Sequence, residues 1–328
     1  MIPRPVLTLG PGGPPRWGRW SASEGGPKTM AGGSNDSVGG AVRPIASSIA
    51  LTRIGDSMDT TELARPVVVG VDGSQAALDA VRWAVDEAVG RSVPLRLVHA
   101  TGVTPRVDQS DDEFRLEREY AETALRAASA AAQSAGREVK VETEILWGSP
   151  DSELVTESHG ASMVCIGSVG IGAIANVLLG STAVTVSMQA QCCVAVLRRG
   201  ARPAPNGSVA VATDGTPDSD GVVIGALDEA RLRGCPVVVV GVRRWESHAP
   251  SYDELDRRTA QLADRYPDVR TKVVATDGGI VRYLTHQRDD DIEMVVVGSA
   301  DADAVADMVG PHDTLFGRDK GHSVLVVR

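Results

Sequence analysis

PVVVGVD, at Pro66–Asp72, is a short run of β-branched residues that ends in an aspartate, and SVAVATD repeats it at Ser208–Asp214. In both places a glycine and a hydroxyl residue follow, and then apolar residues at helical spacing. A continuous apolar run of this length is typical of a strand buried by helices on both faces. The repetition predicts two copies of one α/β unit.

The two copies agree in four further β-branched runs, in the same order. The runs are Leu95–Ala100, Val139–Leu146, Met163–Ser168 and Val194–Arg198 in the first copy, and Val237–Val242, Val269–Ala275, Met294–Ser299 and Val324–Arg328 in the second. Between the runs of the first copy we expect helices at Ala76–Val89, Asp112–Ala135 and Pro150–His159. Alternating strands and helices predict an α/β fold of two tandem, doubly wound, parallel, five-stranded sheets, with a Pro- and Gly-rich linker at Gly200–Gly207.

A chain of 328 residues suits two domains and an additional segment. We expect the first domain at residues 63–200 and the second at 207–328. Residues 1–62 are rich in Gly and Pro and show no periodicity, which predicts a disordered, low-complexity N-terminal extension. One hypothesis is that the natural chain starts at Met58.

Composition disfavours several classes of function. A net charge of −10 without a basic stripe argues against nucleic acid as a partner. The four cysteines form no CxxC pair, so no metal site is predicted. No stretch reaches the roughly 18–20 apolar residues that span a bilayer, so we expect no membrane association and a cytoplasmic location.

The most informative motif is GSVGIGAIANVLLGST at Gly167–Thr182, directly after the fourth run of the first copy. Doubly wound sheets bind ligands at the carboxyl ends of their strands. Glycines let the backbone approach a ligand closely, and Gly180-Ser181-Thr182 opens a helical run at Ala183–Gln189, where free N–H groups favour anions. Asp72, after the first strand, is placed to accept hydrogen bonds from a ribose or an adenine amine. Together these residues predict a nucleoside polyphosphate pocket.

The charge pattern supports this interpretation, because no Asp or Glu occurs from Ser158 to Thr213. Two other phosphate motifs fit poorly. Gly170-x-Gly172-x-x-Ala175 lacks the acidic residue of a dinucleotide fingerprint about 20 positions later, and Gly180-Ser181 lacks the lysine of a P-loop. A purely structural glycine loop stays open as an alternative.

The spacing Gly167-x2-Gly170-x9-Gly180-Ser181 is similar to the nucleotide motif of ATP-binding universal stress proteins. VVVGVDGS at Val67–Ser74 and Gly148-Ser149-Pro150 also resemble that family. Over residues 66–328 the chain resembles the tandem-domain type that is common in actinobacteria. The resemblance implies an adenine nucleotide alpha hydrolase-like fold. It also implies a stress-response regulator that binds ATP, with or without Mg²⁺, and hydrolyses it slowly at most.

The resemblance also implies roles for individual residues. Asp72 would hold the nucleoside, the backbone at Ala100 would contact adenine, and the loop would hold ribose and phosphates. The implied nucleotide-binding set is Gly70, Val71, Asp72, Ala100, Gly167, Gly170, Gly180, Ser181 and Thr182; no catalytic residue is assigned. Family members pair through their last strands, and here that pairing is expected within the chain, between Val194 and Val324. A homodimer of the tandem chain is a further implication.

The second copy departs from the motif. Gly298 remains, but the second glycine position is Asp301, and the Gly-Ser pair falls on Pro311-His312. Carboxylates follow at Asp301, Asp303, Asp307, Asp313 and Asp319. One carboxylate 4 Å from a phosphate charge costs about 4 kcal/mol at an effective dielectric constant of 20. We therefore expect a degenerate second domain that does not bind ATP, and we interpret Asp289-Asp290-Asp291 as a solvated acidic loop.

Two other functions stay open. One is an ATP-using enzyme of a related α/β fold, such as an adenylating or pyrophosphatase-type enzyme, although no Ser-Gly-Gly-type loop follows the first strand and Gly73-Ser74 is too short a match. The other is an ATP-independent scaffold that acts through protein contacts. His99 ends a buried-type strand, and we expect it to be a core or rim residue rather than a catalytic one.

Overall fold

The computed structural model describes residues 65–103, 111–170, 179–200, 207–242, 251–276, 278–286, 292–310 and 322–328. Several sequence predictions fall outside these ranges: the N-terminal extension at 1–62, most of the linker, the Asp289-Asp290-Asp291 cluster and the Pro311-His312 pair. The proposed start at Met58 also falls outside them.

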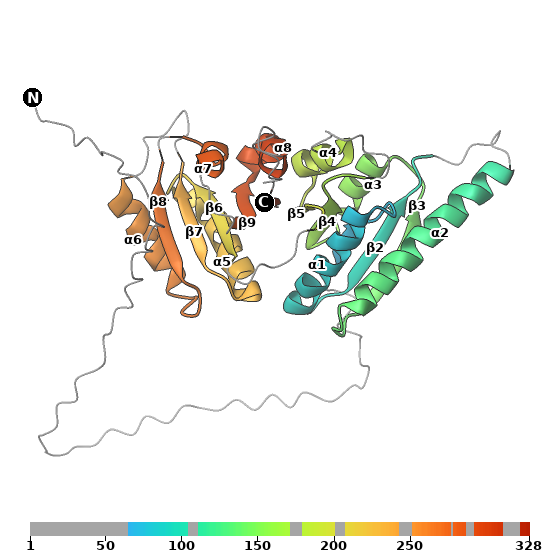
Figure 1. Cartoon of the computed structure of the whole chain (residues 1–328), viewed down its shortest axis with the longest axis horizontal. Helices are drawn as coiled ribbons and strands as arrows, with labels where there is room; N and C mark the ends of the chain where they lie inside the picture. The colour runs from blue at the N-terminus through green and yellow to red at the C-terminus, as the bar shows by residue number, and fades with distance from the viewer. Residues whose placement is uncertain are drawn as a thin grey trace, which may run out of the picture. The chain divides into compact units, whose positions relative to one another are not determined.

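Strands and helices alternate in both halves of the described chain (Figure 1). The first half contains β1 Val67–Gly70, α1 Gln75–Arg91, β2 Leu95–Ala100, α2 Asp111–Ser134, β3 Val141–Leu146, α3 Pro150–Glu157, β4 Met163–Gly167, α4 Ser181–Gln189 and β5 Cys193–Leu197. The second half contains β6 Ser208–Thr213, η2 Pro217–Ser219, α5 Asp220–Arg233, β7 Val237–Gly241, α6 Tyr252–Ala263, β8 Thr271–Ala275, α7 Ile280–His286, β9 Ile292–Gly298, η3 Ser299–Ala304, α8 Val305–Val309 and β10 Ser323–Val327.

The strands form one sheet in the order β3-β2-β1-β4-β5-β10-β9-β6-β7-β8. Neighbouring strands within each half are parallel. The strand order reverses next to β1 in the first half and next to β6 in the second, as in a doubly wound sheet. β5 and β10 are antiparallel, with Val196 opposite Val324 and Val194 opposite Val326. The predicted α/β fold is therefore confirmed, and so is the pairing of the last strands. The two five-stranded parts join edge to edge, while their division into domains at 63–200 and 207–328 stays a prediction.

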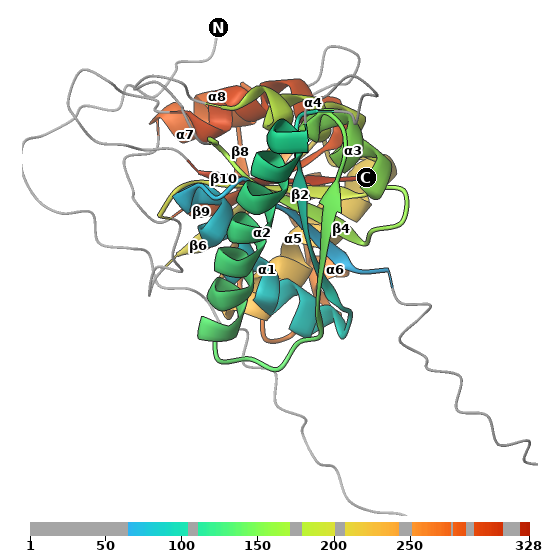
Figure 2. The ribbon, with the colours of Figure 1, turned by 90° about the vertical axis from the view of Figure 1, so that its right-hand side faces the viewer.

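The helices cover the two faces of the sheet separately (Figure 2). Side chains of α1, α2, α5 and α6 share one core cluster, and side chains of α3, α4, α7 and α8 share the other. The alternation along β1 explains this division, since Val67 and Val69 enter the first cluster and Val68 enters the second. The central strands of the sheet are therefore buried on both faces, which explains why the sequence runs that form them are continuously apolar.

α1 shows how local chemistry sets an element's bounds. Ser74 is its N-cap, and the Ser74 hydroxyl accepts a hydrogen bond from the Ala77 amide at 3.1 Å. The predicted stop before Gly90 is wrong by two residues, because the helix continues to Arg91 and ends at Ser92 in the left-handed conformation, with φ 57°. Gly90 packs under α5 instead, where a Cβ atom would lie 2.7 Å from a methyl group of Leu232.

A buried cluster of charges, formed by Glu87, Arg91, Glu229 and Arg233, links α1 to α5. Both glutamates are almost fully buried, at 0% and 1% exposure. Arg91 donates to Glu87 at 3.2 Å and lies 3.4 Å from Glu229, while Arg233 lies 2.5 Å from Glu87 and 3.0 Å from Glu229. Each half contributes one Glu and one Arg four residues later, from the related sequences DEAVGR and DEARLR. The two halves therefore share a polar contact as well as a sheet.

Candidate functional site

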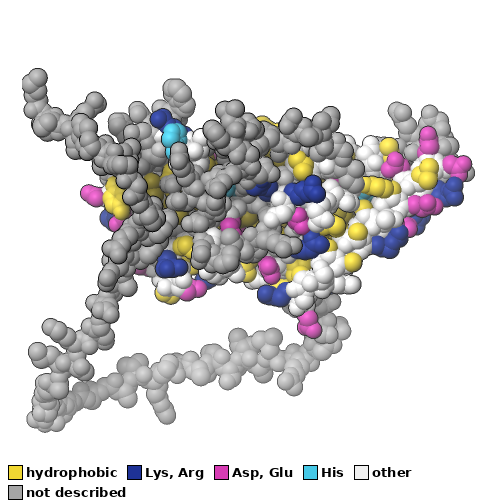
Figure 3. Space-filling model, viewed as in Figure 1, with side chains coloured by type: hydrophobic (Ala, Val, Ile, Leu, Met, Phe, Trp, Pro, Cys, Tyr) yellow, Lys and Arg dark blue, Asp and Glu magenta, His cyan; other side chains and the backbone are white. Residues whose placement is uncertain are grey.

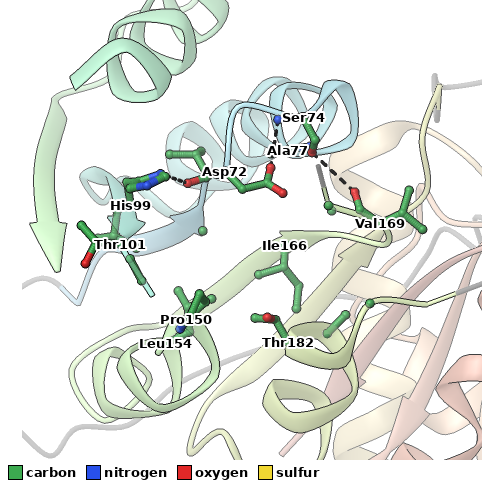
Figure 4. A pocket seen from close by; sticks show the side chains of 18 of the residues that line it. Asp72, Ser74, Ala77, His99, Thr101, Pro150, Leu154, Ile166, Val169 and Thr182 are labelled. Atoms are coloured by element: carbon green, nitrogen blue, oxygen red, sulfur yellow. Dashed lines mark hydrogen bonds between the residues drawn. The ribbon is translucent and has the colours of Figure 1, made fainter. Parts of the chain in front are cut away.

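A cavity of about 480 Å³ opens at the carboxyl ends of β1, β2 and β4 (Figure 4). All nine residues predicted for nucleotide binding line it: Gly70, Val71, Asp72, Ala100, Gly167, Gly170, Gly180, Ser181 and Thr182. They come from four different places in the sequence, and they meet because the strand order reverses between β1 and β4. The structure thus brings the whole predicted set together, while the role of each residue in binding stays a prediction.

Asp72 lies against the loop that follows β4. One of its carboxylate oxygens accepts a hydrogen bond from the Ser74 amide at 2.9 Å, which closes a tight turn before α1. Figure 4 shows the carboxylate pointing toward the middle of the site. A Cβ atom at Gly170 would lie 2.5 Å from Oδ2 of Asp72, so this position has no room for a side chain while the carboxylate stays in place.

Backbone contacts hold the two described ends of the loop between β4 and α4. The Ser168 amide donates to the Leu197 carbonyl at 2.8 Å, and the Gly180 amide donates to the Ser168 carbonyl at 2.8 Å. Gly167 packs directly on α1, where a Cβ atom would lie 2.8 Å from the carbonyl carbon of Ala76. Glycine at 167 is therefore needed for helix packing, in addition to any contact with a ligand.

α4 presents its N-terminus to the cavity. Gly180 is the N-cap, and the first helical hydrogen bond runs from the Val184 amide to the Gly180 carbonyl at 3.1 Å. The amides of Ser181, Thr182 and Ala183 precede that bond and so have no partner within the helix. These amides, two hydroxyl groups and the positive end of the helix dipole form a favourable place for an anion.

His99 is buried, as predicted for a core or rim residue, and it also lines the cavity. Its side chain is 4% exposed, and its Nδ1 atom lies 2.7 Å from the Val71 carbonyl oxygen. The ring meets Tyr120 edge-on, with ring centroids 5.6 Å apart. His99 therefore holds the end of β2 against the residue after β1.

One wall of the cavity carries no sequence motif that predicts it. Glu117 and Tyr120 line it from α2, and Pro150 and Leu154 line it from α3. The Tyr120 hydroxyl donates to the Asp72 carbonyl at 2.7 Å, and partial burial, followed by the charges of Asp72 and Glu117, raises the pKa of this phenol. No motif marks Tyr120, because its place at the site follows only from how α2 packs on the sheet.

The equivalent end of the second half is built differently. Asp214 makes the same turn as Asp72, since it accepts from the Thr216 amide at 3.1 Å. After β9, however, the chain enters η3 and α8 directly, and Met308 and Val309 are buried there. Asp301, at the second glycine position of the motif, lies in η3. The described part of this half therefore packs apolar side chains of η3 and α8 into the core directly after β9.

Among the described residues, no group of three or more His, Cys, Asp and Glu side chains could hold a metal ion. No helix among them combines the length and the apolar composition that crossing a membrane requires.

Residues 64–198 match the Universal stress protein family. Universal stress protein Rv2624c of Mycobacterium tuberculosis is 40% identical over 267 residues, which make up 80% of this chain and 96% of that protein. A crystal structure of a universal stress protein from Archaeoglobus fulgidus covers 80% of this chain and 96% of its own, with 18% identity and a TM-score of 0.58. A universal stress protein solved in complex with cAMP is 28% identical, and the match covers 40% of this chain and 95% of that protein, with a TM-score of 0.31.

The identity to Rv2624c extends over nearly the whole of that protein, and so over both halves of the sheet described above. The chain belongs to the universal stress protein family.

Proposed function

We propose that the cavity of the first half binds ATP and that the protein is an ATP-binding regulator of the stress response. The observation that carries this proposal is the meeting of the nine predicted residues on one cavity. A volume of about 480 Å³ lies within the usual range of ligand pockets.

The distribution of charge supports a nucleotide in one orientation. The phosphates belong beside the N-terminus of α4, where amides and hydroxyl groups of Ser181 and Thr182 face the cavity. The nucleoside belongs beside Asp72, because a carboxylate accepts hydrogen bonds from ribose hydroxyls and repels phosphate. Mg²⁺ would bind together with the phosphates, and the hydroxyl groups of Ser181 and Thr182 would be the oxygen ligands that the protein offers there.

The lining of the cavity supports binding with slow hydrolysis at most. No Lys or Arg is found among the described residues that line it. Fast phosphoryl transfer depends on cations that stabilise charge on the transferred group. In this proposal the described lining offers donors suited to holding phosphates, and it contains no cation that would speed phosphate transfer.

The second half, in this proposal, does not bind ATP. Asp301, in its η3 segment, stands at the motif position of Gly170, and its carboxylate would repel a phosphate there. Its contribution is β10, which covers the edge of β5.

Nucleotide extraction tests the proposal. The purified full-length chain is denatured, and the released nucleotide is identified by chromatography, followed by calorimetric titration of the stripped protein with ATP. We expect about one ATP per chain, and binding that is lost in Gly180→Leu, since the new side chain would enter the cavity from the N-cap of α4. Gly160→Leu is the matched control, because a Cβ atom there meets only the Glu157 carbonyl, at 3.9 Å.

Other results would identify other functions. A chain that carries no nucleotide and takes up none on titration would be a scaffold that acts through protein contacts. Rapid, substrate-dependent turnover of ATP would instead show an enzyme.

A further inference from the structure

The second helix differs between the two halves. α2 has 24 residues, whereas α6, as described, has 12. Both helices end shortly before an edge strand, β3 or β8, so the additional length of α2 lies at its N-terminal end. That additional length carries Glu117 and Tyr120, which line the cavity. The longer helix thus occurs in the half that has the proposed nucleotide site.

Two ring contacts and one hydrogen bond, all made by aromatic side chains, fix this part of α2. Phe114 stacks on Trp147, with ring centroids 4.5 Å apart and planes 10° from parallel. Tyr120 meets His99 edge-on and donates its hydroxyl proton to the Asp72 carbonyl at 2.7 Å. The Tyr120 ring is therefore held in one place beside the cavity before any ligand enters.

The Tyr120 side chain nevertheless remains 45% exposed. Charged side chains gather on the visible surface of this helix (Figure 3), with ion pairs such as Arg115–Asp112 and Arg118–Glu122. An aromatic ring that is fixed, half exposed and turned to a cavity gains free energy when a flat ligand covers it. Because His99 is fully buried, Tyr120 is the exposed aromatic ring among the described lining residues.

The charges around the cavity indicate which part of a nucleotide reaches this ring. Glu117 lines the cavity from α2, about one turn before Tyr120. Asp72, whose backbone carbonyl accepts from the Tyr120 hydroxyl, adds a second carboxylate to the lining. Phosphates avoid these carboxylates and are attracted to α4. The uncharged purine is then left beside α2.

Resting on the proposed ATP site, we propose that Tyr120 is the base contact of the cavity: its ring covers the purine, and its hydroxyl ties α2 to the residue that holds the ribose. Nothing in the spacing of the glycine loop requires this contact. It arises from the additional turns of α2 and from the position of Asp72.

The test compares two ligands that share the phosphates and differ in the nucleoside. Affinities for ATP and for inorganic tripolyphosphate are measured by calorimetry on the full chain, as wild type, Tyr120→Ala, Tyr120→Phe and Leu116→Ala. We expect Tyr120→Ala to weaken ATP about tenfold and to leave tripolyphosphate unchanged. Tyr120→Phe keeps the ring and should weaken ATP only about twofold. Leu116 is 61% exposed one turn earlier and does not line the cavity, so Leu116→Ala should change neither affinity.

Two results would overturn the inference while leaving the ATP site intact: unchanged ATP binding in Tyr120→Ala, or an equal loss for both ligands, which a structural role predicts. A wild-type chain that takes up neither ligand would overturn the ATP site itself, and this contact with it. Melting curves of the variants show whether each one is folded.

Discussion

In each half of the sheet an aspartate follows the first strand and accepts a hydrogen bond from the amide two residues later, at 2.9 Å for Asp72 and 3.1 Å for Asp214. The halves differ after their fourth strands. The first has glycines, hydroxyl groups and an open helix N-terminus around a cavity, and the second has an acidic 3-10 helix and a buried methionine.

The fold and the proposed nucleotide site therefore depend on different residues. The strand order and the Asp turn persist in both halves, so neither distinguishes the half with the proposed nucleotide site from the other half. The residues that differ lie in one loop and in the first turns of one helix. Changing those residues should therefore exchange function between the halves without changing the fold.

The largest expected effect comes from making the first loop resemble the second. Gly170→Asp introduces the acidic residue found at Asp301 and also places a Cβ atom 2.5 Å from the Asp72 carboxylate. One carboxylate near a phosphate costs about 4 kcal/mol, so ATP affinity should fall about a thousandfold. Equilibrium dialysis with labelled ATP measures this loss. Gly160→Asp adds the same charge at an exposed site away from the cavity and should bind ATP like the wild type.

The second prediction concerns the apolar packing of α8 in the second half. Met308 is fully buried, so Met308→Ala should lower the free energy of unfolding by about 3 kcal/mol through lost contacts and a new void. Met188, on α4, is 53% exposed, and Met188→Ala should cost less than about 0.5 kcal/mol. Urea unfolding of both variants gives the two values; equal costs would contradict the account of the second half.

The third prediction concerns the buried charges that join the halves. Burial and then the charge of Glu229 raise the pKa of Glu87 to about 8, and these effects outweigh Arg233 and Arg91. The folded state then keeps a proton that the unfolded state releases above a pH of about 4.5, so stability falls as the pH rises from there to about 8. Between pH 6 and pH 8 the loss should be about 2 kcal/mol.

Glu87→Gln removes this titration, so its unfolding free energy should change less over the same pH range than that of the wild type. Glu229→Gln, at the equivalent position, should flatten the profile in the same direction, because it removes the charge of Glu229 that helps to raise the pKa of Glu87. Glu138→Gln, on the exposed surface, should leave the slope as it is. A wild-type stability that rises from pH 6 to pH 8 would contradict the assignment.

The smallest expected effect concerns the N-cap residues of the first helix in each half. Ser74 caps α1 through its hydroxyl, while no side-chain cap bond is made by Thr216 before η2. Ser74→Ala should therefore cost about 1 kcal/mol of stability, and Thr216→Ala clearly less. Thermal unfolding of the two variants, side by side, decides whether the cap matters.

Much of the fold follows from local pattern. The β-branched runs predict all ten strands to within a few residues, because buried parallel strands must be continuously apolar. The site residues could be found because they follow strand ends in a glycine-rich motif. Tyr120 could not be found, since its contact with Asp72 spans 48 residues and depends on the packing of α2. The charge cluster was also missed, because Glu87 meets Arg233 only once β5 and β10 have paired.

The most direct test of the central claim is the stoichiometry of ATP binding by the full chain and by two matched variants, Asp72→Ala and Asp214→Ala. Calorimetry should give about one site per chain, which disappears in Asp72→Ala and is unchanged in Asp214→Ala. Two sites per chain, or a single site that is lost in Asp214→Ala and kept in Asp72→Ala, would contradict the assignment of the nucleotide to the first half.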